Sequence, residues 1–155
     1  MSKSDKNPAC LQLLLDTIAK AVGTDSNYNA YYGNEHSEED LSAYTLGYII
    51  NVQLDLRAGS RDGYGRYMLP WTSTRGLSNY PHISREEYFT PELQDRLATI
   101  ILIGLGLEEW RANPMTDEAN ESFIDRLSSE WPPIREYPGI KEIIAHAHSL
   151  KLQPI

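Results

Sequence analysis

Two short segments of the chain carry the residues best suited to bind a polar ligand. One follows Gly23, and the other runs through residues 63–68, with a tryptophan shortly after it. An arginine presents a planar fork of donors that matches a carboxylate, and tyrosine and tryptophan rings offer faces on which sugars stack. From these side chains we predict a ligand-binding group at Arg66, Tyr67 and Trp71.

Arg66 and Tyr67 are the strongest candidates in this group, and two roles are open for Arg66. Its guanidinium would either bind a ligand carboxylate or brace the fold through a buried ion pair. Other tyrosines could add stacking faces, although ten tyrosines in 155 residues fit ordinary packing almost as well. Those nearest to the two segments are Tyr28, Tyr31, Tyr32 and Tyr64.

Metal, cofactor and disulfide chemistry find little support in the sequence. His146 and His148 are two residues apart in a helical pattern and do not share a face, so we predict no metal site. Residues 104–106 lack the context of a nucleotide-binding loop, and no cofactor is expected. Cys10 is the single cysteine, which excludes an intramolecular disulfide and suggests a small buried apolar residue.

The first element that must position the candidate residues is a helix that ends just before them. Apolar side chains recur at helical spacing from Leu11 to Val22. Asn7 and Pro8 suit the start of a helix, and Gly23 suits its end. We predict a helix of roughly 14 residues that ends at Val22.

The region after this helix is predicted to form a small β lobe. Residues 24–45 are rich in asparagine, tyrosine, serine and acids, as is typical of an irregular, exposed segment. Residues 46–56 alternate between apolar and polar side chains, which predicts a half-buried strand. After a turn over residues 58–63, residues 64–71 are expected to form a short strand or an extended loop that enters a helix near Trp71.

Three further helices are predicted in the second half of the chain. Proline, glycine and capping residues mark them: Thr90–Pro91 to Gly104, Thr116 or Asp117 to Pro132–Pro133, and Pro138 onward. Together the elements predict an α+β fold, mostly helical, with a small β lobe between the first and later helices. Residues 1–8 are expected to form a disordered tail and residues 9–155 a single domain, in which residues 24–70 could be the smaller of two lobes.

Four segments, in this order, resemble lambda-endolysin-like lysozymes of the phage type. Residues 13–25 are similar to the first helix and following loop of that family, and residues 63–67 to its Gly-Ala-Gly-Arg-Tyr-Gln segment. Residues 89–95 resemble its Phe-Ser-Pro-x-x-Gln-Asp helix start. Residues 113–131 then contain Asn-Pro-Met, Ile-Asp-Arg and a tryptophan in the expected order.

The resemblance implies a lysozyme-like domain and the activity of a lytic transglycosylase. That family cleaves the bond between N-acetylmuramic acid and N-acetylglucosamine in peptidoglycan. A single glutamate gives and then takes a proton while the sugar's own 6-hydroxyl attacks, which yields a 1,6-anhydro sugar without a metal or cofactor.

Two residues depart from the family pattern. Val22 stands where the family has its catalytic glutamate, and Met68 stands where it has glutamine. Valine has no proton to give to the leaving oxygen, so its presence should remove nearly all activity from a mechanism that relies on one acid. The resemblance therefore implies no catalytic residue, and it adds Thr24, Asp25, Gly65 and Met68 to the residues expected to bind substrate. Val22 also continues the apolar stripe of the first helix.

A substitute acid would restore the chemistry, and several carboxylates are candidates: Asp25, Glu35, Glu38 and Glu39, with Asp40 in the same run. Each has a simpler interpretation. Asp25 could cap or brace its loop, and residues 35–40 could be a solvated run of charge that starts a helix.

Charge and hydropathy narrow the function further. The net charge of −8 argues against nucleic-acid binding, which needs a basic footprint, and mildly against a free hydrolase of polyanionic cell walls. No apolar run suits a membrane span or a signal peptide. We expect synthesis in the cytoplasm, with delivery to the periplasm or cell wall by lysis or by a phage or secretion machine.

These observations favour a degenerate lysozyme-like domain without lytic activity. It would recognise peptidoglycan glycan or serve as a structural or interaction part of a phage tail or secretion apparatus. The expected partners are therefore peptidoglycan or a protein of such an assembly. The first alternative is an active muramidase or lytic transglycosylase with a substitute acid, which the retained residues 65–67 favour. The second is a protein-interaction role without any sugar.

Overall fold

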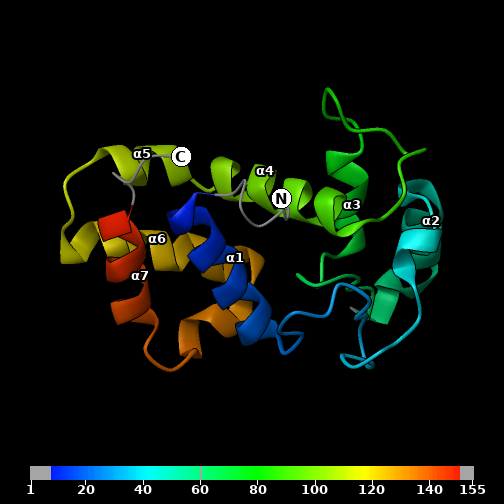
Figure 1. Ribbon diagram of the computed structural model, residues 1–155, viewed down its shortest axis with the longest axis horizontal. Coiled ribbons are helices and arrows are strands. Elements are labelled where there is room, and N and C mark those ends of the chain that lie inside the picture. The colour runs from blue at the N-terminus through cyan, green and yellow to red at the C-terminus, as the bar shows by residue number, and fades with distance from the viewer. Residues whose placement is uncertain (1–7, 60, 151–155) are drawn as a thin grey trace. The chain divides into compact units, whose positions relative to one another are not determined.

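The computed structural model describes residues 8–59 and 61–150 of the chain (Figure 1). The predicted disordered tail lies almost wholly outside these residues. The chain divides into two compact units, and the boundary falls inside helix α4 (Pro91–Gly104). One unit takes in the described parts of Met1–Val22 and Ala98–Ile155, and the other is Gly23–Leu97.

Helix α1 (Ala9–Val22) ends at the predicted residue and begins one residue after Pro8, and the predicted cap Asn7 lies outside the described residues. Leu11, Leu14, Leu15 and Ile18 are buried at helical spacing, and Cys10 is fully buried, as expected. Gly23 follows with φ +89°, a left-handed conformation that glycine adopts without strain and that ends the helix. Val22 is half-buried in the last turn.

The later helices confirm most of the predicted boundaries. Helix α4 begins at Pro91 and ends at Gly104, and helix α6 (Asp117–Glu130) is capped by the Thr116 hydroxyl, which accepts from the Ala119 amide at 3.0 Å. Helix α6 ends before Pro132 and Pro133, and the 3-10 helix η4 (Pro132–Glu136) begins there. Helix α7 (Ile140–Ser149) completes this unit and packs on α1 and α6.

Helix α5 (Leu107–Ala112) was not predicted, and a histidine ties it to α7. His148 is buried, with its ring edge-on to Trp110 at 4.9 Å between centroids. Its Nε2 lies 3.0 Å from the carbonyl oxygen of Trp110 and 2.9 Å from that of Asn113. Both partners are acceptors, so Nε2 carries a proton and donates, and His148 has a packing role.

The predicted β lobe is wrong, because residues 46–56 form a helix. Helix α2 (Leu46–Leu56) starts at Thr45, whose hydroxyl accepts from the Tyr48 amide at 3.2 Å. Its buried residues are Leu46, Ile49, Ile50 and Gln53, which recur at helical spacing. The alternation that predicted a strand depended on Leu54 and Leu56, which are exposed by 42% and 39%.

The described residues therefore hold helices and isolated β-bridges, and the α+β prediction is corrected to an all-helical fold. Short 3-10 helices η2 (Leu41–Ala43) and η3 (Arg57–Gly59) flank α2. Tyr64 and Leu69 exchange two backbone hydrogen bonds of 3.1 and 3.0 Å around a four-residue loop. Helix α3 (Trp71–Leu77) follows and confirms the predicted helix near Trp71.

A fully buried glutamine fastens α2 to the loop and to α3. The Gln53 Nε2 atom donates to the carbonyl oxygens of Asp62 and Leu69, each at 2.6 Å. Its Oε1 accepts from the Thr74 hydroxyl at 2.5 Å. Gln53 thus satisfies buried polar groups from two other elements with one side chain.

We expect Gln53→Leu to lower the free energy of unfolding by about 3 kcal/mol, because buried polar groups would lose their partner. Urea unfolding followed by circular dichroism measures the change. Asn51→Leu, on the exposed face of α2, is the matched control and should change stability far less. Equal effects of the two substitutions would contradict the role of Gln53.

Candidate functional site

Three segments that are far apart in the sequence meet in the Gly23–Leu97 unit. The Gly65 amide donates to the Ala30 carbonyl at 2.7 Å, and the Arg66 amide donates to Gln94 Oε1 at 2.8 Å. Gln94 Nε2 in turn donates to the carbonyls of Tyr28 and Phe89 at 3.0 and 3.1 Å. The first turns of α4 therefore hold the loop of residues 65–68 against the segment around Tyr28.

The segment after α1 joins the same network through Arg66. The Thr24 hydroxyl, which is buried, donates to the Arg66 carbonyl. The Arg66 Nε atom donates to the Asp25 carbonyl at 2.7 Å. Asp25 itself has φ +51° and an exposed side chain, so its backbone rather than its carboxylate serves the network.

The Arg66 guanidinium lies among aromatic rings in the interior. Its central carbon is 5.3 Å from the centroid of Tyr28 and 5.5 Å from that of Tyr67, which are favourable cation–π distances. The Nη1 atom donates to the Tyr67 hydroxyl at 3.1 Å. Arg66 is only 6% exposed and Tyr67 is fully buried.

Asp95 accepts hydrogen bonds from both of these tyrosines. The Tyr67 hydroxyl donates to Oδ1 at 2.5 Å, and the Tyr28 hydroxyl donates to the same oxygen at 2.9 Å. Burial raises the pKa of Asp95 and outweighs the lowering by the two hydroxyls and Arg66. Burial and the neighbouring Asp95 raise the pKa of Tyr67 far above its usual range, so its hydroxyl stays a donor.

We call this network the Arg66 brace. Its members are Thr24, Tyr28, Arg66, Tyr67, Gln94 and Asp95. Of the two roles open for Arg66, its burial and its internal hydrogen bonds favour bracing, and the same holds for Tyr67. Gln94 and Asp95 were not predicted as site residues, although the resemblance at residues 89–95 marked them.

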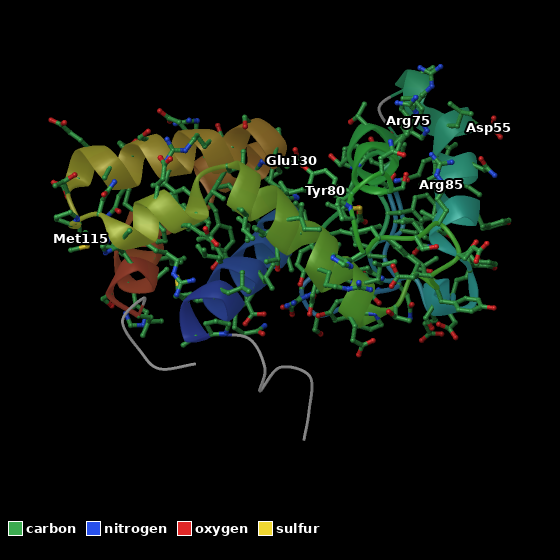
Figure 2. The ribbon with its side chains drawn as sticks, turned by 90° about the horizontal axis from the view of Figure 1, so that it is seen from above. Asp55, Arg75, Tyr80, Arg85, Met115 and Glu130 are labelled. Atoms are coloured by element: carbon green, nitrogen blue, oxygen red, sulfur yellow. The ribbon has the colours of Figure 1, made fainter. Side chains whose placement is uncertain are left out.

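The other predicted site residues lie around the brace or outside it. Met68 is half-buried with φ +47° and closes the turn by donating its amide to the Gly65 carbonyl at 3.1 Å. Trp71, at the start of α3, has the guanidinium carbons of Arg57 and Arg75 at 4.9 and 5.2 Å from its ring centroid. Figure 2 shows Arg75 on α3. Trp71 thus packs against two cationic side chains.

The acidic run at residues 35–40 ends at the cap of the three-residue 3-10 helix η2, and its residues differ in exposure. Asp40 caps η2 by accepting from the Ser42 amide at 3.1 Å. Glu38 and Glu39 are exposed, and the Glu39 Oε2 atom accepts from the Tyr44 hydroxyl at 2.7 Å. Glu35 is half-buried, and its Cγ lies 3.9 Å from the point where a side chain on Gly23 would begin.

Two stacked pairs of tyrosines lie in the same unit. The rings of Tyr31 and Tyr64 are 5.3 Å apart and inclined by 16°, and those of Tyr44 and Tyr48 are 4.8 Å apart and inclined by 20°. Tyr31 and Tyr64 were considered as stacking faces from the sequence. Tyr44 and Tyr48 were not, because Tyr44 precedes the cap of a helix at residues 46–56, where the sequence predicted a strand.

Comparison with models of known protein families, with curated proteins and with solved structures finds no match. Within the described residues, no helix combines the length and apolar character that crossing a membrane requires. Histidine, cysteine and acidic side chains in this part of the chain do not gather into a metal-binding group.

Gly65→Ala tests how tightly the brace closes on the loop. A Cβ at Gly65, where φ is +86°, would lie 2.5 Å from Gln94 Oε1. Gly33→Ala is the matched control, because φ there is +82° and nothing lies within 4 Å. Both should lose about 1–2 kcal/mol to the left-handed backbone, and Gly65→Ala about 1–3 kcal/mol more to overpacking. Equal losses in urea unfolding would contradict the close contact.

Asp95→Asn tests the buried carboxyl through pH. The pKa of Asp95 in the folded chain is raised above its ordinary value of 3.8. Its contribution to stability is therefore fully present at pH values below 3.8. This contribution is lost as pH rises through the folded pKa. The stability of the unsubstituted chain relative to Asp95→Asn should therefore fall as pH rises above about 4.

Urea unfolding of both proteins across a pH series measures this difference. Asp55→Asn, on the exposed face of α2 (Figure 2), controls for the loss of one negative charge. If the stability difference between the unsubstituted chain and Asp95→Asn does not vary with pH, the pKa of Asp95 is not raised in the folded chain.

Proposed function

We propose that this chain recognises peptidoglycan glycan without cleaving it. The observation that carries the proposal is the Arg66 brace, because it joins residues 24–25, 65–67 and 94–95. These are parts of three of the four segments on which the resemblance to lambda-endolysin-like lysozymes rests. If the segments resembled the family only by chance, we would not expect their side chains to bond to one another. That they do supports an arrangement like that of the family around a glycan site.

The absence of cleavage follows from the residue at the end of α1. Protonation of the glycosidic oxygen needs an acid, and Val22 provides none. The last turn of a helix suits such an acid, because the negative end of the helix dipole keeps a carboxyl protonated. The position is therefore suited to the chemistry, but the side chain that occupies it is not.

A second candidate function is lytic activity with Glu35 as the substitute acid. The specific observation in its favour is that Glu35 Cγ lies 3.9 Å from the point where a side chain on Gly23 would begin, and Gly23 directly follows Val22. Glu35 is also half-buried, and the Asn27 side chain donates to its carbonyl at 2.9 Å. Asn27 thus fastens the loop that carries Glu35 within the Gly23–Leu97 unit.

Binding and lysis are tested together on insoluble peptidoglycan. The unsubstituted chain should sediment with peptidoglycan and leave the turbidity of a cell-wall suspension unchanged. Val22→Glu should gain lytic activity, about 10²-fold or more over background, because it supplies the missing general acid. Val22→Gln is the matched control, since an amide of nearly the same shape has no proton to give, and it should gain none.

Each proposed function has an outcome that contradicts it. An unsubstituted chain that stays in the supernatant would overturn glycan recognition and favour the role without any sugar. Clearing by the unsubstituted chain would overturn the non-lytic proposal. Loss of that clearing in Glu35→Gln would identify Glu35 as the substitute acid.

A further inference from the structure

One stretch of the Gly23–Leu97 unit is basic, although the chain as a whole has a net charge of −8. Residues 57–85 contain five arginines and a single acidic residue, Asp62. Arg66 is buried in the brace. The other four arginines are exposed: Arg57, Arg61, Arg75 and Arg85. The local charge of this stretch is therefore opposite to that of the whole chain.

Two of the exposed arginines, from different elements, lie over the same aromatic ring. Arg57 directly follows α2, and Arg75 lies in α3 (Figure 2). Their guanidinium carbons are 4.9 and 5.2 Å from the ring centroid of Trp71, which is half-buried. The electron-rich ring attracts each cation and so keeps both beside one point of the surface. We call Arg57 and Arg75 the arginine pair.

Buried hydrogen bonds fix the ring that holds the arginine pair. The Trp71 amide donates to the buried Asp62 carboxylate at 2.7 Å. Gln53 of α2 accepts from the Thr74 hydroxyl of α3 at 2.5 Å and donates to the Asp62 carbonyl at 2.6 Å. The two helices that carry the arginine pair are thus fastened to each other, and a ligand that binds both guanidiniums loses less free energy to ordering them.

The arginine pair differs from the ion-paired arginines of the chain. Arg96 and Arg135 have Glu87 and Asp125 as carboxylate partners. Within the part of the chain that the structure describes, neither member of the arginine pair has such a partner. Two like charges beside one ring repel each other, and an anion bound to both is attracted by each. Guanidinium groups match the planar geometry of a carboxylate.

We propose that the arginine pair binds a carboxylate of peptidoglycan. This inference rests on the proposed function and gives it a location and a ligand group. Peptidoglycan carries carboxylates in two places, on the lactyl group of muramic acid where the peptide is absent and on the stem peptide. Both offer the same group to the two guanidiniums.

The overall charge of the chain selects against a longer polyanion. Nucleic acids are bound through many phosphate contacts along a basic surface, and a chain with a net charge of −8 repels them beyond the arginine pair. A single carboxylate meets only the charges close to it, because salt screens the others beyond about 8 Å. The basic stretch therefore also reconciles the net charge of the chain with binding to a polyanionic wall.

Isothermal titration calorimetry of the full chain with three soluble probes tests the inference. The first probe is N-acetylglucosaminyl-N-acetylmuramic acid, whose carboxylate is on the lactyl group. The second is the same disaccharide with an L-alanyl-D-isoglutamine peptide, whose carboxylate is on the peptide. The third is chitobiose, which is neutral. At least one carboxylate probe should bind about tenfold or more tightly than chitobiose, and which one does so identifies the source of the carboxylate.

Arg57→Gln and Arg75→Gln should each weaken binding of the carboxylate probe about tenfold and leave binding of chitobiose unchanged. Both side chains are exposed, so both variants should keep the circular dichroism spectrum of the unsubstituted chain. Arg126→Gln is the matched control. Arg126 is also exposed and lies over a ring, 5.9 Å from the centroid of Phe123, but it belongs to the other unit, and its substitution should leave binding unchanged.

The outcomes separate this inference from the proposed function. If the unsubstituted chain sediments with peptidoglycan but both arginine-pair variants bind the carboxylate probes as it does, the inference fails and the proposed function survives. The same holds if the chain sediments and binds chitobiose as tightly as the carboxylate probes, or binds none of the three. Inorganic phosphate that competes as strongly as a carboxylate probe reveals a site for any anion and overturns the assignment. A chain that binds neither peptidoglycan nor any probe overturns both proposals.

Discussion

The packing of the Gly23–Leu97 unit depends on how it stabilises the buried guanidinium of Arg66. A cation withdrawn from water is stable only where hydrogen bonds and electron-rich rings replace its hydration. Here the Asp25 carbonyl, the Tyr67 hydroxyl and two tyrosine faces do so. The hydrogen bonds around Arg66 join three segments into one network: the segment after α1, the loop of residues 65–68 and the start of α4.

Small and polar residues make this network possible. Gly65 lets the backbone approach Gln94 more closely than any side chain would allow, and Gln94 uses both ends of its amide. Gln53 likewise uses both ends of its side-chain amide, and it links α2 to Asp62 and Thr74.

The sequence predicted the helices that carry strong boundary residues and failed where apolar side chains were ambiguous. Gly23, Thr116 and Pro132 mark ends that local chemistry determines, and those predictions are confirmed. Residues 46–56 satisfy both a period of two and a helical period. Burial, which only the tertiary structure reveals, distinguishes them through Gln53 and the exposed Leu54. The structure brings residues 24–25 and 65–67 together with Gln94 and Asp95, which were not predicted as site residues. The burial of Arg66 and Tyr67 could not be read from residue type.

The buried hydrogen bond between Tyr67 and Asp95 couples the loop of residues 65–68 to α4. A double-mutant cycle with Tyr67→Phe, Asp95→Ala and the double substitution, measured by urea unfolding, tests it most directly. We predict that the two substitutions are non-additive by about 1 kcal/mol or more, because removing either partner already breaks the link. Losses that add to within about 0.3 kcal/mol would show that the two side chains act independently and that this hydrogen bond does not couple the loop to α4.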